Sequence, residues 1–289
     1  MTEIVLGVLH GTIYGLIAVG LVLVYRGTRV INFAQGELGV FGLYIAYVLT
    51  TEHQLPWVVG AAGGILAAGA IGVAFEFFVV RRMVDASRLS ISVGTVGLGL
   101  FLLGVELKIW GTSPRRVRGP VAGVGPTIGR VAVSNTEVVA LVVLAVVGFG
   151  LALLLRNTDF GLGVLAASDD PVAVRLVGVP LSRISAFTWG TGAALAAVAA
   201  LLFEPSITVF APAFAQRLFI FGLVAALVGG LSSLPGAFVG GLTVGIIEAV
   251  VRGKTLTSTV PGLTTVAMFV VILLVLLLRP RGLLGRSAA

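Results

Sequence analysis

Long apolar stretches, separated by short polar ones, dominate the pattern of residues along the chain. About 20 apolar residues are needed to cross roughly 30 Å of hydrocarbon as a helix. The pattern therefore predicts an all-α fold, a polytopic transmembrane helical bundle of 8–9 spans. The predicted segments run at about 4–25, 31–50, 56–80, 91–110, 137–155, 184–203, 214–233, 236–250 and 259–278.

Two of these segments, 31–50 and 236–250, are short and rich in glycine. Either of them can be a broken or re-entrant piece, because non-helical backbone is tolerated at membrane depth only where protein surrounds it. Eight full spans therefore remain an alternative to nine.

The composition supports a membrane protein with one domain. The chain is 58% hydrophobic and 11% charged, whereas soluble domains carry about a quarter charged residues. No polar stretch is long enough to bury a core of its own, so we expect a single domain over residues 1–289.

The first apolar run opens with Glu3 and lacks a small-residue cleavage site, which argues against a cleaved signal. The chain has no cysteine, which excludes disulfides and thiol chemistry.

The net charge of +7 is spread over the predicted loops, as is normal for membrane proteins, and this argues against nucleic-acid binding. With nine spans, eleven basic residues fall on one side of the membrane and eight on the other. Basic residues are enriched in cytoplasmic loops. We therefore expect a cytoplasmic C-terminus in a multi-pass protein of the bacterial plasma (inner) membrane.

Glycines recur at intervals of four along several segments. Small residues four apart let two helix backbones approach closely within a membrane. The alternative is that they reflect only the general frequency of glycine in membrane helices. The series are Gly7, Gly11 and Gly15; Gly60 and Gly64; Gly236 and Gly240; and Gly241 and Gly245.

Acids within the apolar segments are candidates for function, because a charge at bilayer depth is costly. Asn32, Gln35 and Glu37 gather in one otherwise apolar stretch. Asn32 can cap a helix whose first turn holds Glu37, where the helix dipole favours an anion. A role for these three residues in a translocation pathway is the competing interpretation.

The other acids have a simpler explanation. Glu76 precedes Arg81 by about one turn, and Glu106 lies close to Lys108 near the end of a segment. We expect both to form ion pairs at helix ends.

Motifs for catalysis or metal binding are weak. The stretch RGKT at 252–255 resembles the end of a phosphate-binding loop, but Glu248 stands where the pattern requires glycine. His10 and His53 lack a second ligand at metal-binding spacing. The sequence therefore predicts no metal site, no cofactor and no enzyme activity.

Four blocks resemble the permeases of branched-chain amino acid ABC transporters, in the order in which that family has them. They are GLIAVGLVLVYRGTRVINFAQGELGVFGLY, TDFGLGVLAASDDPVAVRLVGVPLSRIS, ALVGGLSSLPGAFVGGLTVGIIEAV and the ending LRPRGLLGR. The resemblance covers most of the chain and is to the shorter of the two permease types. Four positions depart from the family pattern: Leu162 and Leu165 replace arginines, Gln35 replaces the commoner histidine, and Ser232 replaces a glycine.

The resemblance implies that the loop at about 156–183 is a cytoplasmic coupling helix seated in an ATPase subunit. Thr158 or Asp159 can cap this helix, and Gly178 and Pro180 can stop it. An amphipathic helix lying on lipid is the alternative. The coupling candidates are Gly161, Ala167, Asp169, Val172, Leu176 and Gly178.

The third block implies tight helix packing, with candidates Gly229, Gly230, Pro235, Gly236, Gly240, Gly241 and Gly245. The resemblance further implies a second homologous permease, two cytoplasmic ATP-binding subunits and an extracytoplasmic solute-binding protein. A stand-alone secondary transporter or channel remains the alternative function. Branched-chain amino acids, urea or short amides, and small carboxylates remain possible substrates.

Overall fold

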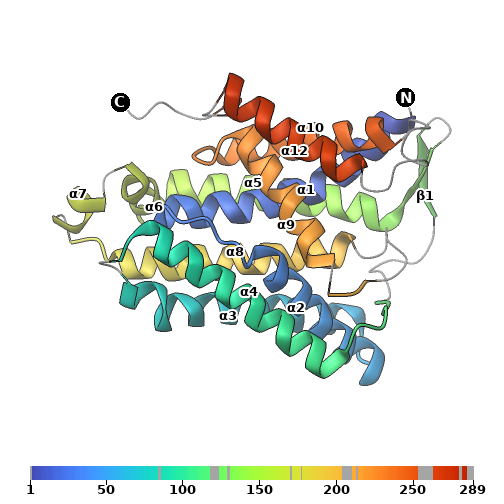
Figure 1. Cartoon of the computed structure of the whole chain (residues 1–289), viewed down its shortest axis with the longest axis horizontal. Coiled ribbons are helices and arrows are strands. Elements are labelled where there is room, and N and C mark those ends of the chain that lie inside the picture. Colours follow the sequence, from blue (N-terminus) through green and yellow to red (C-terminus); the bar gives the residue numbers. More distant parts are fainter. Residues whose placement is uncertain are drawn as a thin grey trace.

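The computed structural model places most of the chain in helices that lie side by side (Figure 1). The long helices run along the longest axis of the molecule. The short helices α6 and α7 lie at one end, and strand β1 lies with the N-terminus at the other. The residues that the structure describes are 2–83, 86–117, 124–128, 131–169, 171–176, 178–203, 210–212, 214–252, 263–279 and 282–284.

The helices follow the predicted apolar segments closely. In chain order they are α1 (Thr2–Thr28), α2 (Gln35–Tyr47), the π-helix η1 (Val48–Glu52), α3 (Trp57–Phe78), the 3-10 helix η2 (Val80–Met83), α4 (Arg88–Trp110), α5 (Asn135–Asn157), α6 (Asp159–Asp169), α7 (Pro171–Leu176), α8 (Leu181–Phe203), α9 (Phe214–Gly229), α10 (Leu234–Arg252) and α12 (Leu263–Leu278).

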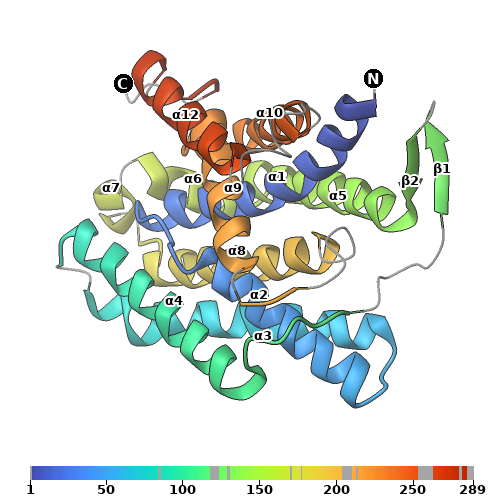
Figure 2. The ribbon, with the colours of Figure 1, turned by 45° about the vertical axis from the view of Figure 1, so that its right-hand side comes forward.

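The fold is helical, as predicted, and it also contains one short hairpin that the sequence pattern did not indicate. Strands β1 (Val124–Ile128) and β2 (Val131–Ser134) pair antiparallel between α4 and α5. The two strands lie at the same end of the molecule as the N-terminus (Figure 2). Alternation in so short a segment is a weak signal beside the long apolar runs that flank it.

Helices α1 and α8 form the centre of the bundle. Almost every side chain of α1 from Leu16 to Val24 is fully buried, and most of α8 beyond Thr188 is buried as well. Helix α1 packs against α10, α8 and α9, while α8 also packs against α2 and α3. By contrast, α3, α4, α5 and α12 carry many large exposed apolar side chains. This distribution suits a bundle whose outer helices face hydrocarbon.

Within the described residues, five helical segments are long and apolar enough to cross a membrane. They are Gly7–Thr28, Trp57–Met83, Arg88–Trp110, Leu181–Phe203 and Leu234–Arg252. The segment predicted to be short at 236–250 is thus one full helix of 19 residues. Helices α9 and α12 are shorter, with 16 residues each, and α5 meets α6 at a bend of 90°.

The segment predicted at 31–50 begins with a non-helical link and then forms one continuous, short helical stretch. Helix α2 has only 13 residues, and a π-helical turn continues it. Between α1 and α2 the chain is not helical, and Arg29 there has a positive φ of 57°. This link sets the geometry of the first candidate site.

Candidate translocation and coupling sites

The non-helical link before α2 carries its polar groups into the interior of the bundle. Asn32 and Gln35 are fully buried. The Asn32 Nδ2 donates to the Gln35 Oε1 at 3.0 Å, and the Gln35 Nε2 donates to the carbonyl oxygen of Gly192 on α8 at 2.8 Å. These bonds satisfy polar groups that would otherwise be costly at this depth. They also tie the start of α2 to the central helix α8.

The predicted capping role of Asn32 is wrong. The N-cap of α2 is Ala34, which makes no side-chain capping bond. The Asn32 Oδ1 instead accepts from the backbone N–H of Ala34 at 3.0 Å. Asn32 therefore holds the turn that precedes the helix, because its short amide can bond the backbone two residues ahead.

Two acids, Glu37 of α2 and Glu106 of α4, carry buried oxygens in this part of the bundle. Glu37 lies in the first turn of α2 against Gly99 of α4. Glu106 lies near the end of α4 and is fully buried. Among the described residues, neither carboxylate oxygen of Glu106 has a hydrogen-bond partner. The Oε2 of Glu37 has none there either. The site therefore offers buried oxygens that can accept a hydrogen bond or hold a proton.

The predicted pairing of Glu106 with Lys108 is wrong for the side chains that the structure describes. Glu106 forms no ion pair with Lys108 there. Residues two apart on a helix do not face each other. Sequence reasoning consequently missed that Glu106 is fully buried without an ion-pair partner among the described side chains.

A further buried acid links three other helices of the bundle. Glu248 of α10 is 1% exposed and accepts from the Tyr14 hydroxyl of α1 at 2.6 Å. Its other oxygen accepts from Arg217 of α9 at 2.9 Å and from Arg252. The Arg217 guanidinium also lies over the Phe221 ring, 5.7 Å from its centroid. Charge-assisted bonds to a buried carboxylate are strong, so this cluster fixes α1, α9 and α10 together.

The two kinds of side-chain contact differ in how far apart the partners lie in the sequence. The pair of Arg81 with Glu76 is confirmed, at 2.9 Å, and the two residues lie five positions apart. Tyr14 and Glu248 are 234 positions apart, so no local pattern indicates their contact.

Glycines line the crossing of α1 and α10. A Cβ added at Gly11 would lie 2.8 Å from the carbonyl oxygen of Gly241, and one added at Gly7 would lie 2.6 Å from the Cα of Ile246. A Cβ at Gly241 or at Gly245 would in turn meet the backbone of α1. The two backbones are thus in direct contact at the glycines that sequence spacing singled out.

A second close contact joins α9 to α10. Gly229 and Gly236 face each other backbone to backbone, and a Cβ at Gly240 would lie 2.8 Å from the backbone nitrogen of Gly229. Gly230 has φ 104°, which a side chain disfavours. The Ser233 hydroxyl accepts from the N–H of Gly236 at 3.0 Å, and Pro235 occupies the first turn of α10, where its missing N–H costs nothing.

The predicted coupling loop forms the two short helices α6 and α7. The Thr158 hydroxyl accepts from the N–H of Gly161 at 2.9 Å, which confirms Thr158 as the cap. Gly161 lies against the backbone of α5 at Leu154, and Ala167 is buried. Leu176 of α7 is instead 85% exposed. The segment thus packs one side on the bundle and presents an apolar side outward.

Gly178 follows α7 with φ 81°, a left-handed conformation that glycine adopts at little cost. Leu162 adds to the exposed apolar side, at 52% exposed. Asp169 and Val172 lie in α6 and α7, but their side chains lie outside the described part of the structure, as does Asp170.

The candidate histidine packs as an aromatic side chain. The His10 ring meets the Phe203 ring edge-on, with centroids 5.6 Å apart. Within the described residues, no group of three or more His, Cys, Asp or Glu side chains could hold a metal ion.

Comparison with known proteins agrees with the resemblance. The family described as "Branched-chain amino acid transport system / permease component" matches residues 4–278. The chain is 31% identical to the high-affinity branched-chain amino acid transport system permease protein BraD of Pseudomonas aeruginosa, over 99% of this chain and 96% of BraD. It is 30% identical to the corresponding LivH of Escherichia coli, over 97% and 94% of the two chains. A probable LivH of Methanocaldococcus jannaschii is 28% identical, over 96% and 90%.

These matches extend over nearly the whole length of each protein, so they include the α2 region, α6, α7 and α10 together. The relatives are transport permeases, and the chain has the apolar helices of a multi-pass membrane protein. The chain belongs to the family of permease components of the branched-chain amino acid transport system.

Proposed function

We propose that this chain is the membrane-spanning subunit of an ABC importer that moves branched-chain amino acids across the inner membrane. The observation that carries the proposal is the α6–α7 segment. It packs on one end of the bundle through Gly161 and Ala167 and leaves the apolar Leu162 and Leu176 exposed. An apolar surface at the end of a membrane bundle is suited to burial against a partner protein.

The α6–α7 segment acts as the coupling element, with Gly161, Ala167, Asp169, Val172, Leu176 and Gly178 as its functional residues. It faces the cytoplasm together with the C-terminus, while β1 and β2 face the opposite side. Residues 1–289 form a single domain with eight or nine membrane segments, of which α2, α9 and α12 are the short ones. The glycines of α10 and of the turn before it hold α1, α9 and α10 in close contact.

The partners follow from this assignment. ATP is bound and hydrolysed by two cytoplasmic subunits, and the chain itself has no enzyme activity. A second homologous permease completes the membrane pathway, and an extracytoplasmic binding protein delivers the substrate. The names of the relatives BraD and LivH support branched-chain amino acids as the substrate class.

An uptake experiment tests the proposal directly. We expect deletion of this chain in its source organism to abolish ATP-dependent uptake of radiolabelled leucine, isoleucine and valine, and a plasmid copy to restore it. Urea, acetamide and a small carboxylate serve as competitors in the same assay. Uptake that survives ATP depletion but collapses with the proton gradient would identify a secondary transporter instead. Competition by urea but not by amino acids would overturn the substrate class.

Asn32, Gln35 and Glu37 line or brace the pathway in this proposal. Glu37→Gln should lower leucine uptake by about tenfold, because a hydrogen bond to a charged group contributes about 1.5 kcal/mol or more, and this energy corresponds to roughly a factor of ten. The amount of assembled protein should stay unchanged, since the amide has nearly the same shape as the carboxylate. Uptake is measured in the complemented deletion strain, with quantification by immunoblot.

The matched control is Glu52→Gln, which changes an exposed acid at the end of η1. This variant should transport normally. If Glu37→Gln also transports normally, Glu37 has only the dipole role at the start of α2, which contributes about 0.3–1 kcal/mol to stability.

A further inference from the structure

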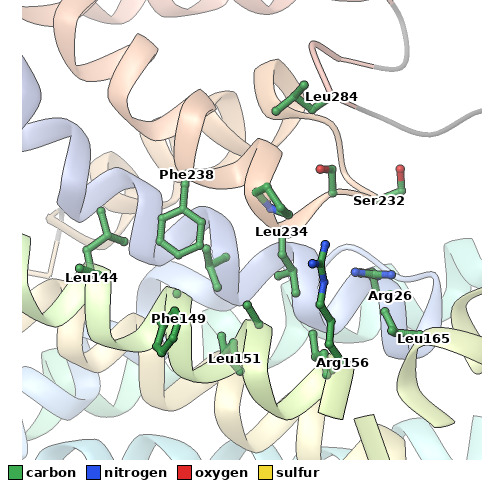
Figure 3. Close-up of a pocket in the computed structure, with 17 residues that line it drawn as sticks. Arg26, Leu144, Phe149, Leu151, Arg156, Leu165, Ser232, Leu234, Phe238 and Leu284 are labelled. Carbon is green, nitrogen blue, oxygen red and sulfur yellow. The ribbon is translucent and has the colours of Figure 1, made fainter. Parts of the chain in front are cut away.

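An open cavity of about 770 Å³ lies between α1, α5 and α10, with the start of α10 as part of its wall (Figure 3). Its size is within the range of about 300–1,000 Å³ that is usual for ligand pockets. Helix α6 closes one end through Leu165, and Leu284 borders the same region. Most of the wall is apolar, and its larger apolar side chains are Leu144, Phe149, Leu151, Leu155, Leu234 and Phe238.

The polar groups of this cavity gather at one end. Arg26 lies in the last turn of α1, and Arg156 lies in the last turn of α5. In Figure 3 both arginines lie on the same side as Ser232, while Leu144 and Phe149 line the opposite part. The described residues that line the cavity include no acid. The cavity is therefore amphiphilic, with a basic end and an apolar length.

The start of α10 adds to the positive potential at the basic end. Ser233, Leu234 and Pro235 line the cavity there, and they are the cap and the first turn of α10. A helix N-terminus carries a partial positive charge. Three positive groups of different origin thus surround one end of the cavity.

We propose that this cavity binds one anionic phospholipid. Its phosphate lies between Arg26 and Arg156 at the start of α10, and one acyl chain lies along Leu144, Phe149 and Phe238. Basic pockets between membrane helices bind anionic head groups, and long arginine side chains reach the interface from within the apolar region. The ligand lies in the leaflet that surrounds the end of the molecule bearing α6.

Other occupants fit the cavity less well. A soluble anion would leave the apolar length filled with water, which costs free energy in proportion to the apolar area. An apolar helix from a neighbouring subunit would bury the Arg156 guanidinium without bringing a counter-charge, which is costly. A phospholipid supplies both the negative charge and the hydrocarbon.

The test uses the full chain, purified in mild detergent and incorporated into nanodiscs that contain phosphatidylglycerol and phosphatidylcholine in equal amounts. Native mass spectrometry after release counts the lipids retained by each chain. We expect one retained phosphatidylglycerol in the unaltered chain, and about fivefold lower occupancy in Arg156→Gln, as removal of one basic contact near the surface predicts. The control Arg82→Gln removes an exposed positive charge of η2 at the same end and should leave occupancy unchanged.

A second variant tests the hydrocarbon part without changing any charge. Ala152 lines the cavity and is exposed, so Ala152→Phe should fill the groove and lower phosphatidylglycerol retention while the chain stays monodisperse. Equal retention of phosphatidylcholine and phosphatidylglycerol would overturn the proposal, as would unchanged retention in both variants. A cysteine placed at Ala152 that crosslinks in membranes to a protein subunit, and not to a photoreactive phosphatidylglycerol, would also overturn it.

Discussion

The double substitution Leu162→Glu and Leu176→Glu should abolish the stimulation of ATP hydrolysis by substrate while leaving the permease folded. The two leucines are 52% and 85% exposed on the α6–α7 segment. Burial of a leucine side chain against a partner contributes about 1.5–3 kcal/mol. Two buried glutamates would instead have to lose their hydration, which is far more costly. We expect substrate-stimulated hydrolysis by the assembled importer to fall by at least about tenfold, and basal hydrolysis to remain.

The measurement compares ATPase rates of the reconstituted complex with and without loaded binding protein. Leu89→Glu is the matched control, because Leu89 is 74% exposed in the first turn of α4, at the same end of the bundle but outside the segment. That variant should retain stimulation.

The chain has no cysteine, so the variant Leu176→Cys carries a single thiol for crosslinking. It should crosslink to an ATPase subunit. Crosslinking only to phospholipid, together with full stimulation in the double glutamate variant, would show that α7 lies on the membrane surface.

The substitution Gly240→Leu should prevent the chain from folding. A Cβ at this position would lie 2.8 Å from the backbone nitrogen of Gly229 and 3.0 Å from the carbonyl carbon of Ala225. Neither atom can move without shifting α9, so relief of the clash must separate α9 from α10. Overpacking of this kind costs about 1–3 kcal/mol or more where only side chains must give way. Here backbone must move, and we expect loss of the monodisperse peak in detergent size-exclusion chromatography.

Gly104→Leu provides the comparison, because a Cβ at Gly104 of α4 meets nothing within 4 Å. Both substitutions add the same side chain to a helical glycine and raise helix propensity equally. Gly104→Leu should therefore elute like the unaltered chain and unfold at the same or a higher temperature. If Gly240→Leu behaves in the same way, α9 and α10 are not in backbone contact and these glycines reflect composition alone.

The sequence by itself determined the helical bundle and the order of its segments. Apolar length is a property of a local stretch, and the membrane requires each spanning stretch to satisfy its own backbone. For the same reason, local chemistry predicted the Thr158 cap, the stop at Gly178 and the pair of Glu76 with Arg81.

Spacing also identified glycines that touch a neighbouring helix, because residues four apart share one face. It could not show which helix each face meets. The structure places Gly241 and Gly245 against α1, and Gly236 and Gly240 against α9.

Only the tertiary structure decided the surroundings of the buried polar groups. Glu106 is fully buried and forms no ion pair with Lys108 among the described side chains, and Asn32 bonds the turn before α2 instead of capping it. Tyr14 and Glu248 meet across 234 positions. The amphiphilic cavity likewise combines side chains from α1, α5 and α10. These features depend on how helices that are distant in the sequence pack together. Packing in a membrane depends on how well the surfaces of two helices fit each other, and the sequence of one helix alone does not show this.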